Sequence, residues 1–176
     1  MSTTAPSPNN FYQHGLPQPF HISAGALLFN DQTEICTHHF YATEVSANLL
    51  FLLGGLSEGY HLMRESLEGD ESLQTAVHRG LYEEFGATGT IEKYLGSQVC
   101  MVTTPERQFE KLTVYHAVRL IELGDRPDID AESRSKMEWY SAVDLLSMYE
   151  KQAAMTDRPE LNETEIIRRF MTAYGL

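Results

Sequence analysis

The chain has 176 residues, the length of one compact domain, because single hydrophobic cores extend over roughly 100–200 residues before chains divide. Apolar residues make up 42% and charged residues 22% of the sequence, which excludes collagen-like, coiled-coil and wholly disordered proteins. No apolar run reaches the roughly 18–20 residues that span a bilayer, and the polar N-terminus lacks the basic and then apolar order of a signal peptide. We therefore expect a cytoplasmic protein without a membrane partner.

The charge of the chain restricts its partners. Thirteen Lys and Arg residues against 25 Asp and Glu residues give a formal net charge of −12. No Lys and Arg cluster stands out that could neutralise successive phosphates, so duplex nucleic acid is not an expected partner. The same acidity would repel a small phosphorylated ligand unless divalent cations occupy some of the carboxylates. The acidic clusters are therefore the candidate metal sites.

The chain divides into an arm and a domain. Residues 1–19 contain four prolines and mostly small polar side chains, which predicts a flexible N-terminal arm outside the core. Such an arm offers contacts to a second subunit. Residues 20–176 are left as a single domain.

The first predicted elements form an antiparallel hairpin. Phe20–Phe29 is predicted as a strand, Asn30–Asp31 as a turn, and Glu34–Tyr41 as the return strand. Asn48–Leu53 is a short apolar run that ends at two glycines, and Tyr60–Met63 is predicted as another short strand.

A helix of about four turns is predicted within Glu65–Ala87, with Ser72 as its N-terminal cap and Gly86 as its C-terminal stop. At about 100° per residue, the apolar residues define one inward-facing arc, and these are Leu73, Ala76, Val77, Leu81 and Phe85. Glu84 and Gly80 lie inside this arc. Glu83 borders it, with Arg79 one step further round.

The position of Glu84 has an electrostatic consequence. An ionised carboxylate taken from water without partners costs on the order of several kcal/mol, so an inward-facing Glu84 must be neutral, ion-paired or bound to a cation. The alternative interpretation is that Glu83 and Glu84 are solvated residues on the surface of the helix. The arc favours the first interpretation.

The second half of the chain predicts strands followed by helices. The expected strands share β-branched and aromatic residues, and they are Thr90–Leu95, Gln98–Thr103 and Lys111–Ile121. Glu138–Tyr140 leads into a helix over Ser141–Glu150, where Ser141 and Asp144 have the spacing of a capping box, and Asn162–Tyr174 is predicted as the C-terminal helix. These elements predict a mixed sheet packed between helices.

Glu65–Ala87 resembles the Nudix box, whose pattern is Gly, five residues, Glu, seven residues, Arg-Glu, an aliphatic residue, one residue, Glu-Glu, one residue, Gly and an aliphatic residue. The matching positions are Glu71, Arg79, Leu81, Glu83, Glu84 and Gly86, with Ala87 a loose match. Two positions depart, because Glu65 stands where the family has Gly and Gly80 stands where it has the Glu of Arg-Glu. Ser23–Asn30 and Met137–Met148 are similar to other strands and helices of that family.

The resemblance implies an α/β/α sandwich with a mixed sheet. It implies hydrolysis of a nucleoside diphosphate linked to another group, with Mg²⁺ or Mn²⁺ held by the helix glutamates, and therefore a small nucleotide-type ligand. It also implies a homodimer, and an ion pair between Glu71 and Arg79 with a structural role.

The carboxylate that is absent at Gly80 leaves three hypotheses. In the first, the protein is a metal-dependent pyrophosphohydrolase in which Glu65 replaces that carboxylate, as a ligand or a water-orienting base beside Glu83 and Glu84. In the second, the protein has lost hydrolysis and binds a nucleotide or a partner for regulation. In the third, the match is accidental and the chain is an unrelated acidic domain.

The loop Thr104–Glu110 follows a predicted strand and offers further candidates. The resemblance implies that such a loop can add an acidic residue to the metal or the water, and Glu106 and Glu110 are the residues available. Arg107 is a candidate for binding a substrate phosphate, because Arg contacts phosphate in a bidentate way. Each of the three can equally be a solvated surface residue. His38 and His39 are adjacent on a predicted strand, so they point to opposite faces and are assigned structural roles.

Overall fold

The computed structural model describes residues 20–42, 55–103, 108–128 and 134–176. The first two strands, β1 (Phe20–Phe29) and β2 (Ile35–Tyr41), form the predicted antiparallel hairpin. In the turn, the amide of Thr33 donates to the carbonyl of Asn30 at 2.9 Å, and Thr33 adopts a φ of 60°.

The described strands form one mixed sheet. The remaining strands are β3 (Glu58–His61), β4 (Met63–Ser66), β5 (Ala87–Thr103), β6 (Gln108–Leu123) and β7 (Lys136–Tyr140). The order is β3-β2-β1-β6-β5, with β4 paired to β1 and β7 paired to β2. β1 and β6 are parallel, and the other pairs are antiparallel. On one edge, β1 pairs with β4 in its first half and with β2 only at its end, whereas its other edge pairs with β6. The neighbour of β1 on the first edge therefore changes partway along the strand.

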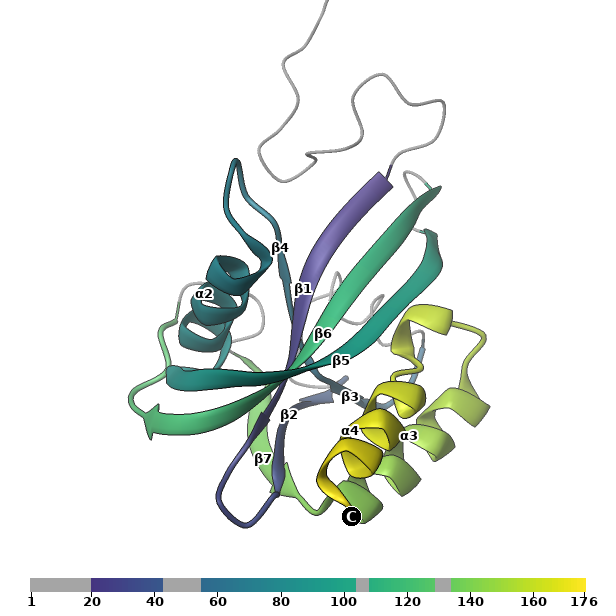
Figure 1. Ribbon diagram of the computed structural model, residues 1–176. Helices are drawn as coiled ribbons and strands as arrows, with labels where there is room; N and C mark the ends of the chain where they lie inside the picture. The colour runs from purple at the N-terminus through teal and green to yellow at the C-terminus, as the bar shows by residue number, and fades with distance from the viewer. Residues whose placement is uncertain (1–19, 43–54, 104–107, 129–133) are drawn as a thin grey trace, which may run out of the picture.

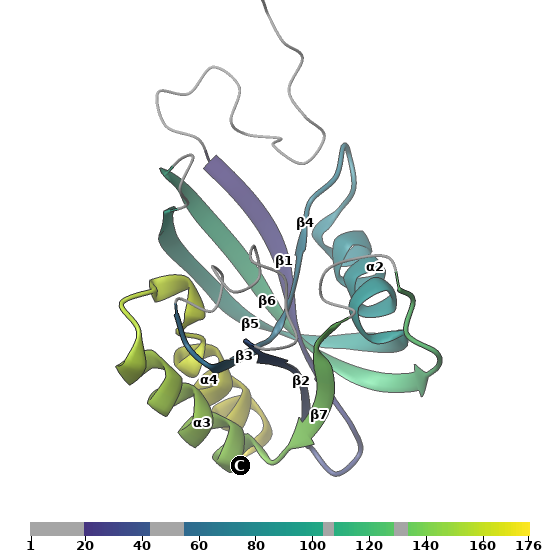
Figure 2. The same ribbon diagram turned by 180° about the vertical axis from the view of Figure 1, so that it is seen from behind.

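Helices cover both faces of the sheet (Figures 1 and 2). Helix α2 (Leu73–Phe85) lies on one face, whereas α3 (Ala142–Met155) and α4 (Thr164–Tyr174) lie on the other, joined through the short 3₁₀ turn η3 (Pro159–Leu161). The predicted α/β/α sandwich with a mixed sheet is therefore confirmed. In the described part of the chain, no helix has the length and hydrophobicity needed to cross a bilayer.

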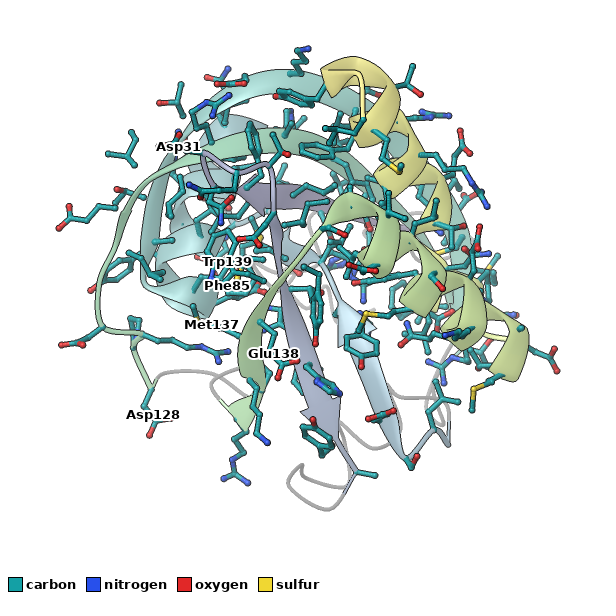
Figure 3. All side chains as sticks on the ribbon, turned by 90° about the horizontal axis from the view of Figure 1, so that it is seen from below. Asp31, Phe85, Asp128, Met137, Glu138 and Trp139 are labelled. Atoms are coloured by element: carbon teal, nitrogen blue, oxygen red, sulfur yellow. The ribbon has the colours of Figure 1, made fainter. Side chains whose placement is uncertain are left out.

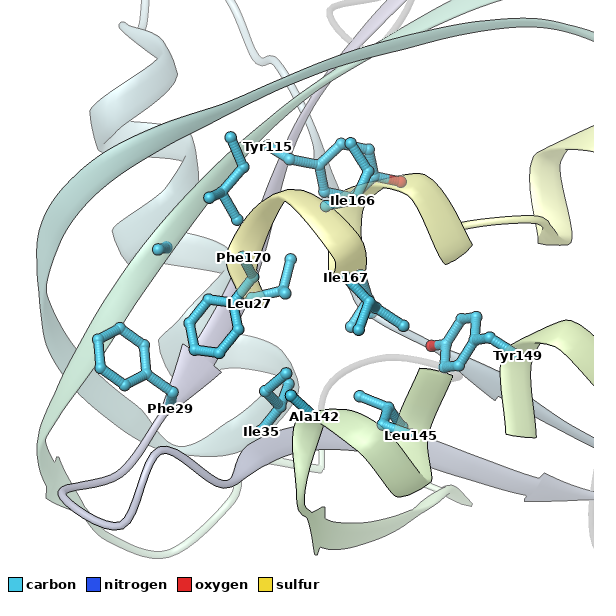
Figure 4. Close-up of a cluster of buried hydrophobic side chains, with 13 residues drawn as sticks. Leu27, Phe29, Ile35, Tyr115, Ala142, Leu145, Tyr149, Ile166, Ile167 and Phe170 are labelled. Atoms are coloured by element: carbon cyan, nitrogen blue, oxygen red, sulfur yellow. The ribbon is translucent and has the colours of Figure 1, made fainter. Parts of the chain in front are cut away.

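Two hydrophobic cores result from the alternation of side chains along β1. Ala24, Ala26 and Leu28 point toward α2 and pack with its buried residues. Leu27 and Phe29 point the other way and pack with residues of α3 and α4 (Figure 4). At the end of α2, Phe85 is joined by Met137 and Trp139 of β7 (Figure 3).

The boundaries of several predicted elements were wrong. The two strands predicted over 90–95 and 98–103 are one strand, β5, because the residues around Gly96 form a β-bulge in the ladder with β6 instead of a break. The single strand predicted over 60–63 is two strands, because the chain changes its partner from β2 to β1 at Leu62. Helix α3 continues beyond Glu150 to Met155, and α4 begins at Thr164.

Some predictions fall outside the described residues. These are the arm at 1–19, the apolar run at 48–53, and Glu106 and Arg107 in the loop before β6, all of which stay predictions. Glu110 lies in β6, half-buried.

Candidate functional site

The ends of α2 are fixed by local sequence. The Ser72 side chain accepts a hydrogen bond from the amide of Thr75 at 3.1 Å, and Gly86 ends the helix in the left-handed region at a φ of 63°. Both predicted caps are confirmed. The buried face of the helix is also the predicted one, and it consists of Ala76, Val77, Gly80, Leu81, Glu84 and Phe85.

Glu65 on β4 fills the space beside Gly80. A Cβ atom placed on Gly80 would lie 2.7 Å from the Cβ of Glu65 and 2.7 Å from the sulfur of Met63. Real Cβ atoms do not approach one another so closely, so the side chain at position 65 and a side chain at position 80 exclude each other in this packing. The two departures from the Nudix box are therefore one coupled exchange of volume.

Arg79 ties the loop after β4 to the helix. Its guanidinium reaches the Glu71 carboxylate at 2.6 Å, the Glu65 carboxylate at 3.1 Å and the Glu83 carboxylate at 3.2 Å, and it donates to the Ser66 carbonyl at 2.7 Å. Burial opposes ionisation of Glu71, but hydrogen bonds from Arg79 and from a backbone amide outweigh burial and lower the pKa of Glu71. One guanidinium thus contacts three carboxylates closely, and a fourth, that of Glu68, lies at 3.9 Å.

The charge around Glu65 is not balanced by Arg79. Burial raises the pKa of Glu65 to about 7, and the negative charges of Glu84 and Glu83 add to the rise against the opposing effect of Arg79. The three carboxylates are therefore close enough to repel one another. A further positive charge at this place would relieve that repulsion.

Glu84 has a partner that the sequence analysis did not find. Its carboxylate lies 2.7 Å from Nε2 of His38, and the two side chains are 5% and 1% exposed. His38 does point away from His39, as predicted, since His39 contacts Glu138 on the other face at 2.7 Å. The missed signal was the alternation along β2, which places His38 on the same face as the buried Cys36 and therefore toward α2.

Comparison with known proteins identifies the fold. No model of a known protein family matches the sequence, and no curated protein matches it. The MutT protein from Methanosarcina mazei Go1 is similar in structure over 92% of this chain and 100% of its own, with a TM-score of 0.60 and 18% identity. A Nudix hydrolase from Nitrosomonas europaea is similar over 87% of this chain and 89% of its own, with a TM-score of 0.59 and 16% identity. The chain has the Nudix fold.

A third structure, the E. coli ORF135 protein, agrees with this assignment at a TM-score of 0.52, with 18% identity, 88% of this chain and 91% of its own covered. At these identities the likeness concerns the fold alone. What the site does must be argued from its residues.

The Nudix fold implies a divalent metal ion, and the donor set here fits one by its chemistry. Glu65, Glu83 and Glu84 supply the hard carboxylate oxygens that Mg²⁺ and Mn²⁺ prefer. Burial raises the pKa of Glu65 and the charges of Glu84 and Glu83 add to the rise, and a bound cation would oppose both effects. Among the described residues, however, no three acidic, His or Cys side chains converge on one point, because Glu65 and Glu83 are turned to Arg79. Metal binding therefore requires rotation of these two side chains.

A second charged group lies on the opposite face of the Nudix sheet, unforeseen from the sequence. Arg64, the neighbour of Glu65 on β4, faces the fully buried Glu163 at 3.7 Å, and Glu163 also accepts from the amide of Leu62 at 3.1 Å. Lys111 on β6 lies near this pair. Burial, together with the positive charge of Arg64, lowers the pKa of Lys111 to about 8. Among the residues that the structure describes, the ammonium group of Lys111 has neither a hydrogen bond nor an ion pair.

Proposed function

We propose that the protein is a divalent-metal-dependent pyrophosphohydrolase that cleaves a nucleoside diphosphate linked to another group. The observation that carries the proposal is that a Cβ added to Gly80 would lie 2.7 Å from the Cβ of Glu65, so the Glu65 side chain occupies the space beside Gly80. The helix lacks a carboxylate at position 80, and the adjoining strand carries one beside it at position 65. The site therefore keeps the number of carboxylates that the family pattern requires.

Each carboxylate has a separate role in this proposal. Glu83 and Glu84 hold the Mg²⁺ or Mn²⁺ ion, and Glu65 completes the group as a third ligand or as the base that orients the attacking water. The ion would neutralise pyrophosphate charge and acidify the water. Arg79 holds Glu65 and Glu83 when no cation is present, and its bond to Glu71 keeps it in place after they turn.

Three further expectations belong to the same proposal. The ligand is a small nucleotide, Arg107 binds one of its phosphates, and the protein is a homodimer. Tests of these follow once a substrate is known.

The experiment compares two glutamates, one on β4 and one in the loop that follows it. Glu65→Gln keeps the shape of the side chain and should lower Mn²⁺-dependent phosphate release at least about 100-fold, as loss of a catalytic base or ligand does. Glu68→Gln is the matched control, because Glu68 is exposed and lies 3.9 Å from Arg79. The substrates are nucleotide sugars, ADP-ribose and dinucleotides. Equal activity of both variants would reject the role of Glu65.

The double variant Glu65→Gly, Gly80→Glu moves the carboxylate back to the helix. Since the strand no longer carries a Cβ at position 65, the helix can accept the new side chain once the flexible thioether of Met63, also at 2.7 Å, moves aside. We expect this variant to recover part of the activity that Glu65→Gly loses alone. A double variant that folds and stays as inactive as Glu65→Gly would contradict the exchange.

A second candidate function is nucleotide binding without hydrolysis. It is favoured by the ion pairs of Arg79, which already compensate Glu65 and Glu83 in part. Nucleotide binding by the purified protein, without phosphate release from any substrate in the presence of Mn²⁺, would select this function over hydrolysis.

A further inference from the structure

A chain of hydrogen bonds leads from a cationic side chain to Glu84. Arg126 donates through Nη1 to the carbonyl of Ser135 at 2.9 Å and to its hydroxyl at 3.1 Å. The Ser135 hydroxyl lies 2.7 Å from Nδ1 of His38. On the other side of the ring, Nε2 of His38 lies 2.7 Å from the carboxylate of Glu84. All bonds in this chain have good length.

The chemistry of the members sets the direction of the bonds at the two ends. A guanidinium can only donate, so the Ser135 hydroxyl accepts from Arg126. A hydroxyl both donates and accepts, so Ser135 can pair with Nδ1 of His38 in either tautomer. A carboxylate can only accept, so Nε2 of His38 donates to Glu84. The ring thus presents a donor to the carboxylate and holds it in place.

Packing holds this series of hydrogen bonds at the C-terminal end of α2. The His38 ring lies 4.4 Å from the Phe85 ring, centroid to centroid, so the histidine is fixed against the residue that follows Glu84. A Cβ on Gly86 would lie 2.9 Å from the Cα of Arg126, so the backbone of Arg126 packs directly on the end of the helix. The amide of Gly124 donates to the carbonyl of Gly86 at 2.9 Å. Strand β2, the end of α2 and the segment around Gly124 and Arg126 thus meet near Glu84.

We propose that His38 is a positioning residue that holds the Glu84 carboxylate in place beside Glu65 and Glu83 and thereby sets the affinity for the divalent cation, while Ser135 and Arg126 hold the His38 ring. The inference deepens the proposed function and rests on it. Carboxylates that bind metal ions are themselves held by hydrogen bonds, and loss of such a partner weakens metal binding by about 10–100-fold. A network with a merely structural role would change stability without changing cation affinity.

Two substitutions of His38 separate these roles. In His38→Gln, the side-chain amide nitrogen can occupy the place of Nε2 and still donate to Glu84, whereas the contact with Ser135 is lost. In His38→Asn, the amide can occupy the place of Nδ1 and contact Ser135, but it is too short to reach Glu84. Both variants lose the ring that packs on Phe85, so each controls for the destabilisation of the other.

The measurement is titration with Mn²⁺, followed by the loss of the free-ion signal in electron paramagnetic resonance, with urea unfolding of each variant. We expect His38→Asn to bind Mn²⁺ at least about tenfold more weakly than the parent, and His38→Gln to stay near the parent. Equal Mn²⁺ affinities of the two variants would overturn the inference and leave the proposed function standing. A parent protein that does not bind Mn²⁺ would overturn both.

A second measurement does not depend on metal or on the His38 variants. Nitrogen-15 NMR of the parent should show a hydrogen on Nε2 of His38, and Ser135→Ala should change the shift of Nδ1 because that nitrogen loses its contact with the hydroxyl. A parent ring without a hydrogen on Nε2 would overturn the inference, because that nitrogen could not donate to Glu84, and this outcome is readable even if His38→Asn fails to fold.

Discussion

Replacing Gly80 by Ala should destabilise this protein, although the same change in the interior of an exposed helix is stabilising. Alanine is favoured over glycine by about 1 kcal/mol within a helix. Here the added methyl group would lie 2.7 Å from the Cβ of Glu65, which is attached directly to the backbone and cannot move aside without shifting β4. Overpacking of this kind costs about 1–3 kcal/mol, so we expect a net loss of up to about 2 kcal/mol in the free energy of unfolding.

Two further backgrounds test the cause. In Glu65→Gly the opposing Cβ is gone, and the sulfur of Met63, which stays at 2.7 Å, lies near the end of a flexible side chain that can shift, so Gly80→Ala should become neutral or stabilising. In Glu65→Ala the charge and the ion pair with Arg79 are lost but the Cβ stays, so Gly80→Ala should remain destabilising. Urea unfolding of the three single variants, the two double variants and the parent gives the coupling free energy between the two positions, expected at about 1–3 kcal/mol only with Glu65→Gly.

A stabilising Gly80→Ala in the parent would refute this reasoning. The same effect of Gly80→Ala in the Glu65→Ala and Glu65→Gly backgrounds would refute it too, because the exclusion would then not involve the Cβ at position 65.

Arg79→Ala should lower the free energy of unfolding by about 1–3 kcal/mol, because it leaves hydrogen-bonded carboxylates without their partner. The control is Arg168→Ala, which removes an exposed ion pair of 2.7 Å to Glu150. Equal melting temperatures of Arg79→Ala and the parent would show that Arg79 serves another purpose. Titration of Glu84→Gln should show weaker Mn²⁺ binding than the parent, and unchanged affinity would reject this residue as a ligand. The pKa of Lys111 is lowered to about 8 in the folded protein, against an ordinary value of 10.5, so the unfolded chain holds more protons between these values and the free energy of unfolding should gain a rising contribution as pH increases from 8. Lys111→Met should remove that contribution in urea unfolding at pH 7, 8 and 9.5, and identical pH profiles of variant and parent would count against it.

Local signals in the sequence determined the elements of this protein and one face of its central helix. The caps at Ser72 and Gly86 act within one turn, and the period of the apolar residues places Glu84 inward whatever the helix packs against. The hairpin of β1 and β2 likewise depends on residues next to one another in the chain. The resemblance to the Nudix box, carried by the same short stretch, led to the correct fold.

Tertiary structure alone decided which side chains meet. The carboxylate of Glu84 lies beside His38, which is 46 residues away, because the strand register of β2 and the packing of α2 together bring them to 2.7 Å. The sequence suggested that Glu65 replaces the carboxylate absent at Gly80, but a Cβ at position 80 would meet that of Glu65 at 2.7 Å only because β4 pairs with β1 in a register that turns Glu65 toward the helix. A shift of one residue in that register would turn Arg64 toward the helix instead, and no local pattern in the sequence fixes the register of so short a strand.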